Sequence, residues 1–140
     1  MAVAGPAARR IDPRTVAAIA VGALPGGAAR YGLTQLIVVP AGGFPWATLW
    51  TNLSGSLALG VLLAVLIERY PPSLYARAFI GTGFLGAYTT FSTFAVETDL
   101  LVKDGHAWTA GAYVAASLAG GLAAAALGLA AGRRIGVRRR

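Results

Sequence analysis

Long apolar stretches separated by short polar breaks dominate the pattern of this chain. Four stretches, at about 15–39, 45–67, 74–102 and 107–131, are each long enough to cross a bilayer, since a membrane-spanning helix needs about 20 apolar residues. The breaks between them are rich in proline, glycine and charge, which end helices. The pattern therefore predicts an all-α integral membrane protein with four transmembrane helices in one domain, 15–131. A basic N-terminal tail, 1–14, and a basic C-terminal tail, 132–140, flank this domain.

The third apolar stretch departs from a plain helix over residues 81–94, GTGFLGAYTTFSTF. Three glycines weaken helix propensity there, and two threonines then lead into Phe91 and Phe94. Non-helical backbone at membrane depth is tolerated only where protein or a water-filled path covers it. We therefore expect the third helix to be broken near its middle, with carbonyls and helix ends free to hold ions, as in transport proteins.

Composition and charge support a membrane location. The chain is 56% hydrophobic and 12% charged, with a mean hydropathy of +0.65, which is too apolar for an ordinary soluble domain. It has no cysteine and one histidine, so thiol chemistry and a histidine metal cluster are excluded. The net charge of +7 comes from arginines at the ends and in loops, which fits lipid head groups rather than nucleic acid.

The distribution of basic residues predicts the orientation. Both termini and the second loop carry ten of the 12 basic residues, and the opposite side has only Arg30 and Lys103. Because positive residues mark the cytoplasmic side, we expect a multi-pass protein of the cell (plasma or inner) membrane with both termini in the cytoplasm.

Polar residues within the second and fourth stretches recur at helical spacing. Thr48, Asn52 and Ser56 lie four residues apart, as do Tyr113 and Ser117, so each set shares one helix face. Donors of this kind can replace part of the water shell of an anion. The alternative for Asn52 is a hydrogen bond that joins two helices, and for Tyr113 it is close packing in the interfacial belt.

The third stretch brings aromatic rings and hydroxyls together. Phe91 and Phe94 project from one face, and an anion would meet their positively polarised ring edges. Two phenylalanines alone indicate ordinary packing, but Ser92 and Thr93 beside them favour a functional site. Glu97, one turn later, is either solvated or part of the same polar track. In the first stretch, Arg30 is either a snorkelling anchor or a charge that attracts anions.

At these positions the chain resembles the Fluc or CrcB family of fluoride channels. The matches are GALPGGAARY (Gly22–Tyr31), PWATLWTNLSGSLALG (Pro45–Gly60) and TTFSTF (Thr89–Phe94), and together with the weaker Tyr113 and Ser117 pattern they touch all four stretches. The resemblance implies passive export of fluoride from the cytoplasm, which lowers its toxicity, through two pores in an antiparallel dimer of four-helix subunits.

The resemblance also implies roles for individual residues. The pore would be lined by Phe91, Phe94, Asn52, Thr48, Ser92, Thr93, Tyr113, Ser117 and Glu97, with Arg30 in the vestibule. A structural sodium ion at the dimer centre would be held by the backbone carbonyls of Gly86 and Thr89 from both subunits. Ala23 and Gly27 depart from the family pattern, and Pro25 is unusual in it.

The charge bias raises the question of the dimer partner. Members that pair with themselves insert in both orientations and tend to have balanced basic counts, whereas others pair with a related chain of opposite, fixed orientation. The bias favours the second arrangement, although pairing with itself stays open. The alternative functions are a small proton-coupled multidrug exporter and a non-transporting membrane subunit. The exporter mechanism requires a membrane-buried carboxylate, typically in the first span, and residues 15–39 contain no acidic residue. An enzyme is not expected, because the sequence has no nucleophile–base pair, metal cluster or phosphate loop.

Overall fold

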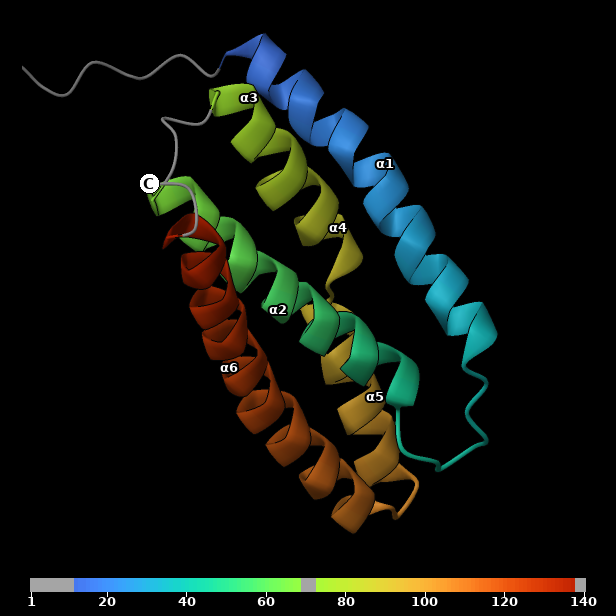
Figure 1. Cartoon of the computed structure of the whole chain (residues 1–140). Coiled ribbons are helices and arrows are strands. Elements are labelled where there is room, and N and C mark those ends of the chain that lie inside the picture. The colour runs from blue at the N-terminus through green and yellow to red at the C-terminus, as the bar shows by residue number, and fades with distance from the viewer. Residues whose placement is uncertain (1–11, 69–72, 138–140) are drawn as a thin grey trace, which may run out of the picture.

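The computed structural model describes residues 12–68 and 73–137 of the chain, and its regular elements over these ranges are all helices (Figure 1). In chain order they are α1 (Pro13–Leu36), α2 (Trp46–Glu68), α3 (Leu74–Arg77), the π-helix η1 (Ala78–Leu85), α4 (Gly86–Tyr88), α5 (Phe91–Lys103) and α6 (Ala107–Val137). The all-helical fold class is therefore confirmed.

Three of these helices, α1, α2 and α6, are long and apolar enough to cross a membrane. The third predicted stretch, 74–102, is divided among α3, η1, α4 and α5, each of which is shorter than 18 residues. Membrane-spanning helices are thus confirmed, while a count of four spans stays a prediction.

The helix limits differ from the predicted stretches by a few residues. The first helix ends at Leu36 rather than near 39, and α6 continues to Val137 rather than ending near 131. Asp12 caps α1 by accepting a hydrogen bond from the Arg14 backbone (3.0 Å), and Pro13 follows at the first helical position, where proline is well tolerated. The rest of the expected tail 1–14, and residues 69–72 and 138–140, lie outside the described residues.

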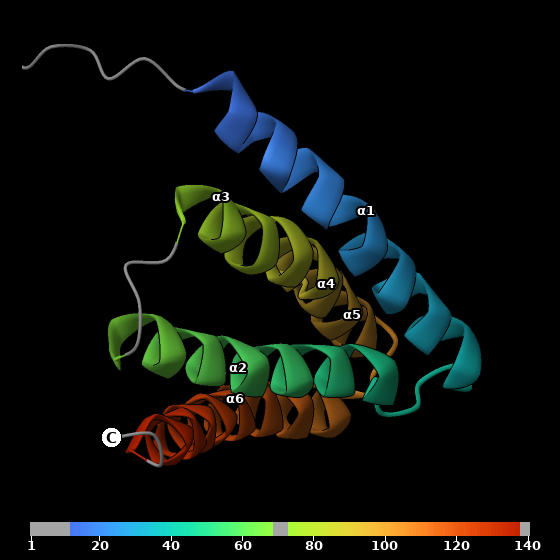
Figure 2. The same cartoon turned by 45° about the horizontal axis from the view of Figure 1, so that its top comes forward.

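The helices form two tightly packed pairs, α1 with η1 and α2 with α6 (Figure 2). Glycines create both contacts. A Cβ on Gly26 would overlap the backbone carbonyl of Phe84 in η1, and a Cβ on Gly128 would overlap that of Leu57 in α2. Small residues allow backbones to approach in this way when lipid provides no hydrophobic drive between helices.

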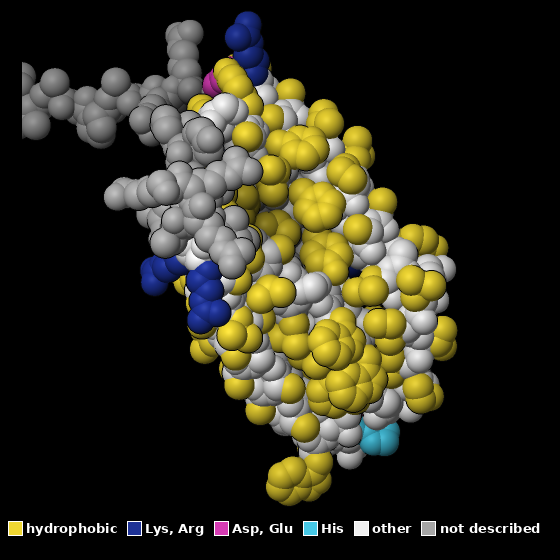
Figure 3. Space-filling view, in the orientation of Figure 1, with side chains coloured by type: hydrophobic (Ala, Val, Ile, Leu, Met, Phe, Trp, Pro, Cys, Tyr) yellow, Lys and Arg dark blue, Asp and Glu magenta, His cyan; other side chains and the backbone are white. Residues whose placement is uncertain are grey.

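A small core joins α5 to the α2–α6 pair. It consists of the buried residues Leu49, Leu101, Ala110 and Tyr113, with Phe94 packed against it. Apolar side chains cover much of the outside as well, and the dark-blue basic side chains that lie where α1 begins and α6 ends are arginines (Figure 3). An apolar exterior is what lipid contact requires.

Candidate functional site

The helical path is interrupted at Thr89 and Thr90. Both residues have extended backbone, with ψ values of 158° and 124°, before α5 begins at Phe91. The side chain of Thr90 caps α5 by accepting a hydrogen bond from the Thr93 backbone (3.2 Å). An interruption of this kind frees the last carbonyls of the preceding helix from their helical partners.

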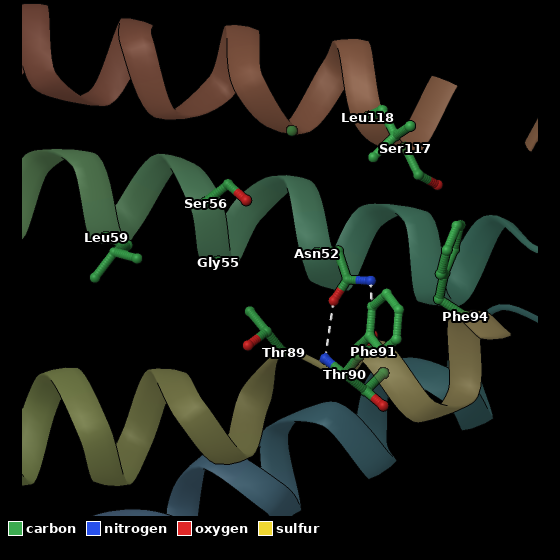
Figure 4. A pocket seen from close by; sticks show the side chains of 11 residues that line it. Asn52, Gly55, Ser56, Leu59, Thr89, Thr90, Phe91, Phe94, Ser117 and Leu118 are labelled. Atoms are coloured by element: carbon green, nitrogen blue, oxygen red, sulfur yellow. Dashed lines mark hydrogen bonds between the residues drawn. The ribbon is translucent and has the colours of Figure 1, made fainter. Parts of the chain in front are cut away.

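Asn52 of α2 binds this interruption with both ends of its amide (Figure 4). Its Oδ1 accepts a hydrogen bond from the Thr90 backbone N–H (2.9 Å), and its Nδ2 donates one to the Thr90 carbonyl (3.0 Å). In a continuous helix the Thr90 N–H would bind the Gly86 carbonyl, so Asn52 replaces that bond. The amide therefore joins two helices, and one Nδ2 hydrogen is left over for another acceptor.

A pocket of about 310 Å³ lies beside this contact. Asn52, Thr89, Phe91, Phe94 and Ser117 all contribute to its lining (Figure 4). The hydroxyl oxygen of Ser117 is buried and has no hydrogen-bond partner among the described residues. Since a buried hydroxyl without a partner costs free energy, this oxygen is a candidate contact for a bound ion or water.

The two phenylalanines on the first turn of α5 differ in exposure. Phe91 is 79% exposed, whereas Phe94 is partly buried. Their ring centroids lie 5.8 Å apart, and Phe94 also contacts the ring of Tyr113 at 5.1 Å. Phe94 is therefore held by the core, while Phe91 borders the open side of the pocket.

Behind Phe94, a hydrogen-bonded triad links α2, α5 and α6. The Glu97 carboxylate accepts one hydrogen bond from the Thr48 hydroxyl (2.8 Å) and one from the Tyr113 hydroxyl (2.8 Å). Thr48 is 2% exposed and Tyr113 is fully buried. Two donors on one carboxylate satisfy a charge that would otherwise be costly inside a membrane protein.

A second pocket, of about 200 Å³, lies on the α1 side of the interruption. Arg30 lines it together with hydroxyl side chains, namely Tyr31, Thr34, Thr48, Thr51, Thr90 and Thr93. Arg30 also donates a long hydrogen bond to the Thr89 carbonyl (Nη1 to O, 3.4 Å). The combination of a guanidinium and several hydroxyls suits an anion.

Most of the predicted site residues line one of the two pockets, which share Thr90. Asn52, Phe91, Phe94 and Ser117 line the first pocket, and Arg30, Thr48 and Thr93 line the second. Glu97 and Tyr113 contribute through the triad. Ser92 is exposed and lines neither pocket, and its hydroxyl lies 3.3 Å from that of Thr90.

The sequence prediction missed Tyr31, Thr34 and Thr51, three hydroxyl residues that line the second pocket. Two hydroxyl residues that the sequence did point to also contribute: Ser56 lines the first pocket, and Thr90 of the TTFSTF motif lines both. Ser56 continues the stripe of Thr48 and Asn52, so helical spacing was a usable signal for it. Thr51 lies off that stripe, and its hydroxyl binds the Ala47 carbonyl (2.8 Å), so the spacing gave no sign of it.

A hard cation such as sodium could be held at this site by backbone carbonyl oxygens rather than by side chains. The described residues contain no group of three or more acidic, histidine or cysteine side chains that would hold a metal. The Gly86 carbonyl belongs to the turn before the interruption, and the Thr89 carbonyl, which also accepts the long hydrogen bond from Arg30, belongs to the interruption itself. Carbonyl oxygens are the ligands that sodium and similar cations accept, so this donor set fits the expected ion.

Helices of membrane-spanning length arranged around an interrupted helix with polar pockets define an α-helical membrane protein. Comparison with known families identifies which one. The profile of the family described as "CrcB-like protein, Camphor Resistance (CrcB)" matches residues 17–129. The chain belongs to the CrcB family.

Curated relatives agree with this assignment. A protein of Streptomyces avermitilis named fluoride-specific ion channel FluC 3 is 45% identical over 93% of this chain and 64% of its own length. A second protein of that species, named FluC 2, is 45% identical over 84% of this chain and 77% of its own length. FluC 1 of Mycolicibacterium paratuberculosis is 39% identical over 91% of this chain and 97% of its own length. These names describe ion channels, not enzymes, and they confirm the resemblance stated from the sequence.

Proposed function

We propose that this protein is a fluoride-selective ion channel that passively exports fluoride from the cytoplasm and so lowers its toxicity. The observation that carries the proposal is the pocket at the interrupted helix, in a chain whose curated relatives are named fluoride-specific ion channels. Its lining offers the donors that a small anion needs once its water shell is removed.

The pocket residues have distinct roles in this proposal. Fluoride is met by the ring edges of Phe91 and Phe94, whose hydrogens carry partial positive charge. The unused Nδ2 hydrogen of Asn52 and the unpartnered hydroxyl of Ser117 add conventional hydrogen bonds. Several weak donors, rather than one strong charge, bind the ion firmly enough to enter and loosely enough to leave.

Hydroxyls around the pocket extend this path as a polar track. Ser92 and Thr93 lie on the turn that carries the two phenylalanines, and Thr48 and Tyr113 present hydroxyls held by Glu97. Arg30, in the second pocket, provides the positive potential that concentrates anions at the entrance.

A structural sodium ion fits the carbonyls of Gly86 and Thr89. When bound, it would supply a positive charge beside the pocket. Asn52 contributes to that arrangement, because its bond to the Thr90 N–H leaves the Gly86 carbonyl without its helical partner.

We further propose that the working unit is an antiparallel dimer in the cell membrane. Phe91 is largely exposed in the single chain, and the first pocket opens on the same side, so a second chain is needed to close the path. The partner is either a second copy or a related chain of opposite orientation, and the rest of the surface contacts membrane lipid.

The alternative functions have less support. A proton-coupled multidrug exporter wants a buried carboxylate in its first helix, and Pro13–Leu36 contains none. A subunit that only packs against partners does not need an unpartnered buried hydroxyl beside two polar pockets.

The test is fluoride efflux from liposomes that contain the purified chain, read with a fluoride electrode beside a parallel chloride measurement. We expect rapid loss of fluoride with chloride retained, from the chain alone or together with a related chain of opposite charge bias. Phe91→Ile or Phe94→Ile should slow fluoride at least about tenfold, since loss of about 1.4 kcal/mol of stabilisation has that effect.

Trp108→Ile is the matched control, because Trp108 is 94% exposed and lies at the start of α6, outside both pockets. Unchanged flux in both phenylalanine variants with normal assembly would rule out a role for the ring edges. Equal loss of fluoride and chloride would contradict selectivity.

A further inference from the structure

Three consecutive residues at the end of the interrupted helix are fixed to a single turn of α2. Thr90 is bound by Asn52 through two hydrogen bonds, at 2.9 and 3.0 Å. Thr89 places its methyl group where Gly55 leaves room, since a Cβ on Gly55 would overlap it. Tyr88 reaches Ser54, with the two hydroxyl oxygens 2.8 Å apart. The interruption is therefore docked on α2 by three adjacent contacts.

The direction of the Ser54–Tyr88 bond follows from counting hydrogens. The Ser54 hydroxyl has one hydrogen, and its oxygen lies 2.6 Å from the Trp50 carbonyl, which only accepts. That short contact uses the Ser54 hydrogen. Tyr88 must then donate to the Ser54 oxygen, while its ring stacks on Phe84 at 6.1 Å with an interplanar angle of 12°. Both ends of the Tyr88 side chain are thereby fixed.

We infer that Ser54 and Tyr88 are positioning residues that hold the helix interruption in register on α2. The inference rests on the proposed conduction of fluoride through the pocket beside this interruption. Neither residue lines either pocket, so both act through Thr89 and Thr90, which do.

The bond direction makes the two partners unequal. Tyr88→Phe removes the donor and leaves Ser54 satisfied by the Trp50 carbonyl. Ser54→Ala removes the acceptor and leaves the Tyr88 hydroxyl without a partner. The contact is exposed in the single chain but lies on α2, a helix of membrane-spanning length, so in the membrane it faces lipid or a second chain rather than water, and the unpaired hydroxyl is the costly case. To regain a bond, Tyr88 must move, and Thr89 and Thr90 move with it.

The experiment compares fluoride efflux per assembled channel for Ser54→Ala, Tyr88→Phe, the double variant and Ser54→Thr. We expect about a tenfold loss in Ser54→Ala, as for an unpaired hydroxyl, and at most about a twofold loss in Tyr88→Phe. The double variant should recover to the Tyr88→Phe level, and Ser54→Thr should match the wild type because it keeps the hydroxyl. Thr98→Val is the control, since that hydroxyl binds only the Phe94 carbonyl of its own helix.

The proposal is overturned if Ser54→Ala conducts like the wild type, or if adding Tyr88→Phe does not restore flux. A wild type that fails to conduct fluoride overturns the proposed function instead. In that case the midpoint of thermal unfolding in detergent, measured on the same proteins, still tests the positioning contact. The same order of variants would support it, and equal midpoints would overturn it.

Discussion

At the residue scale, the site depends on polar groups that satisfy one another inside an apolar protein. The Glu97 carboxylate is the acceptor for two buried hydroxyls, Thr48 and Tyr113, which come from different helices. Their hydrogen bonds therefore contribute both to helix packing and to the chemistry of the polar track. Removing one donor separates these contributions better than removing the carboxylate, since the carboxylate carries its own desolvation cost.

Tyr113→Phe is expected to lower the free energy of unfolding by about 1.5–3 kcal/mol, the usual range for a hydrogen bond to a charged group. The ring stays in the core, so no cavity contributes, and Glu97 loses one partner. Thermal unfolding in detergent measures the change. Tyr31→Phe is the matched control, because Tyr31 is 66% exposed and its hydroxyl only accepts a hydrogen bond from Gln35 on the next turn of α1. An equal shift in both variants would show that the Glu97 bond contributes nothing specific.

At the element scale, the two helix pairs owe their closeness to glycine. Gly26 lies against the backbone of η1, whereas a Cβ added to Gly32, on the same helix, would meet nothing within 4 Å. The two glycines lie on the same helix, but Gly26 is at a close helix–helix contact and Gly32 is not. This contrast separates the effect of helix–helix approach from the effect of helix propensity.

Gly26→Ala should lower the midpoint of thermal unfolding by an amount equivalent to about 1–3 kcal/mol, as overpacking does. Gly32→Ala should leave the midpoint unchanged or raise it, because alanine favours a helix by up to about 1 kcal/mol relative to glycine. Circular dichroism or fluorescence during heating provides the measurement. A stable Gly26→Ala protein would mean that α1 and η1 do not approach as closely as described.

The interrupted helix was the part of the fold that local chemistry predicted best. Gly81, Gly83 and the threonine pair indicated a break, and the extended backbone lies at Thr89 and Thr90. The π-helical turns of η1 were not predictable, because apolar periodicity does not distinguish them from α-helix over eight residues.

Contacts between distant residues were harder to predict than the elements themselves. Asn52 was expected at the site from its stripe, yet its pair of hydrogen bonds to the Thr90 backbone depends on how α2 lies against the interruption. The Ser54–Tyr88 bond joins residues 34 apart, and neither shows a pattern in the sequence. Tertiary packing, rather than local propensity, determines both contacts.

At the scale of the whole molecule, the path of the chain and its charge agree. The start of α1 and the end of α6 lie at one end of the molecule (Figures 1 and 3). Arg14, Arg77, Arg133 and Arg134 belong to the segments at that end. At the opposite end, Lys103 is paired with Asp99 (2.6 Å). This hydrogen bond raises the pKa of Lys103, and the Asp99 carboxylate offsets the positive charge of the lysine.

This distribution predicts that the chain inserts in one orientation, with both termini in the cytoplasm, because basic residues are retained on that side. The chain has no cysteine, so single cysteines report orientation without background. In Asp104→Cys, a membrane-impermeant maleimide should label intact cells almost completely, since Asp104 lies in the exposed α5–α6 turn. In Arg134→Cys, labelling should require permeabilised membranes. An antiparallel dimer of chains with one fixed orientation needs a related partner of opposite bias, whereas equal labelling of both positions in intact cells would mean dual insertion and pairing of the chain with itself.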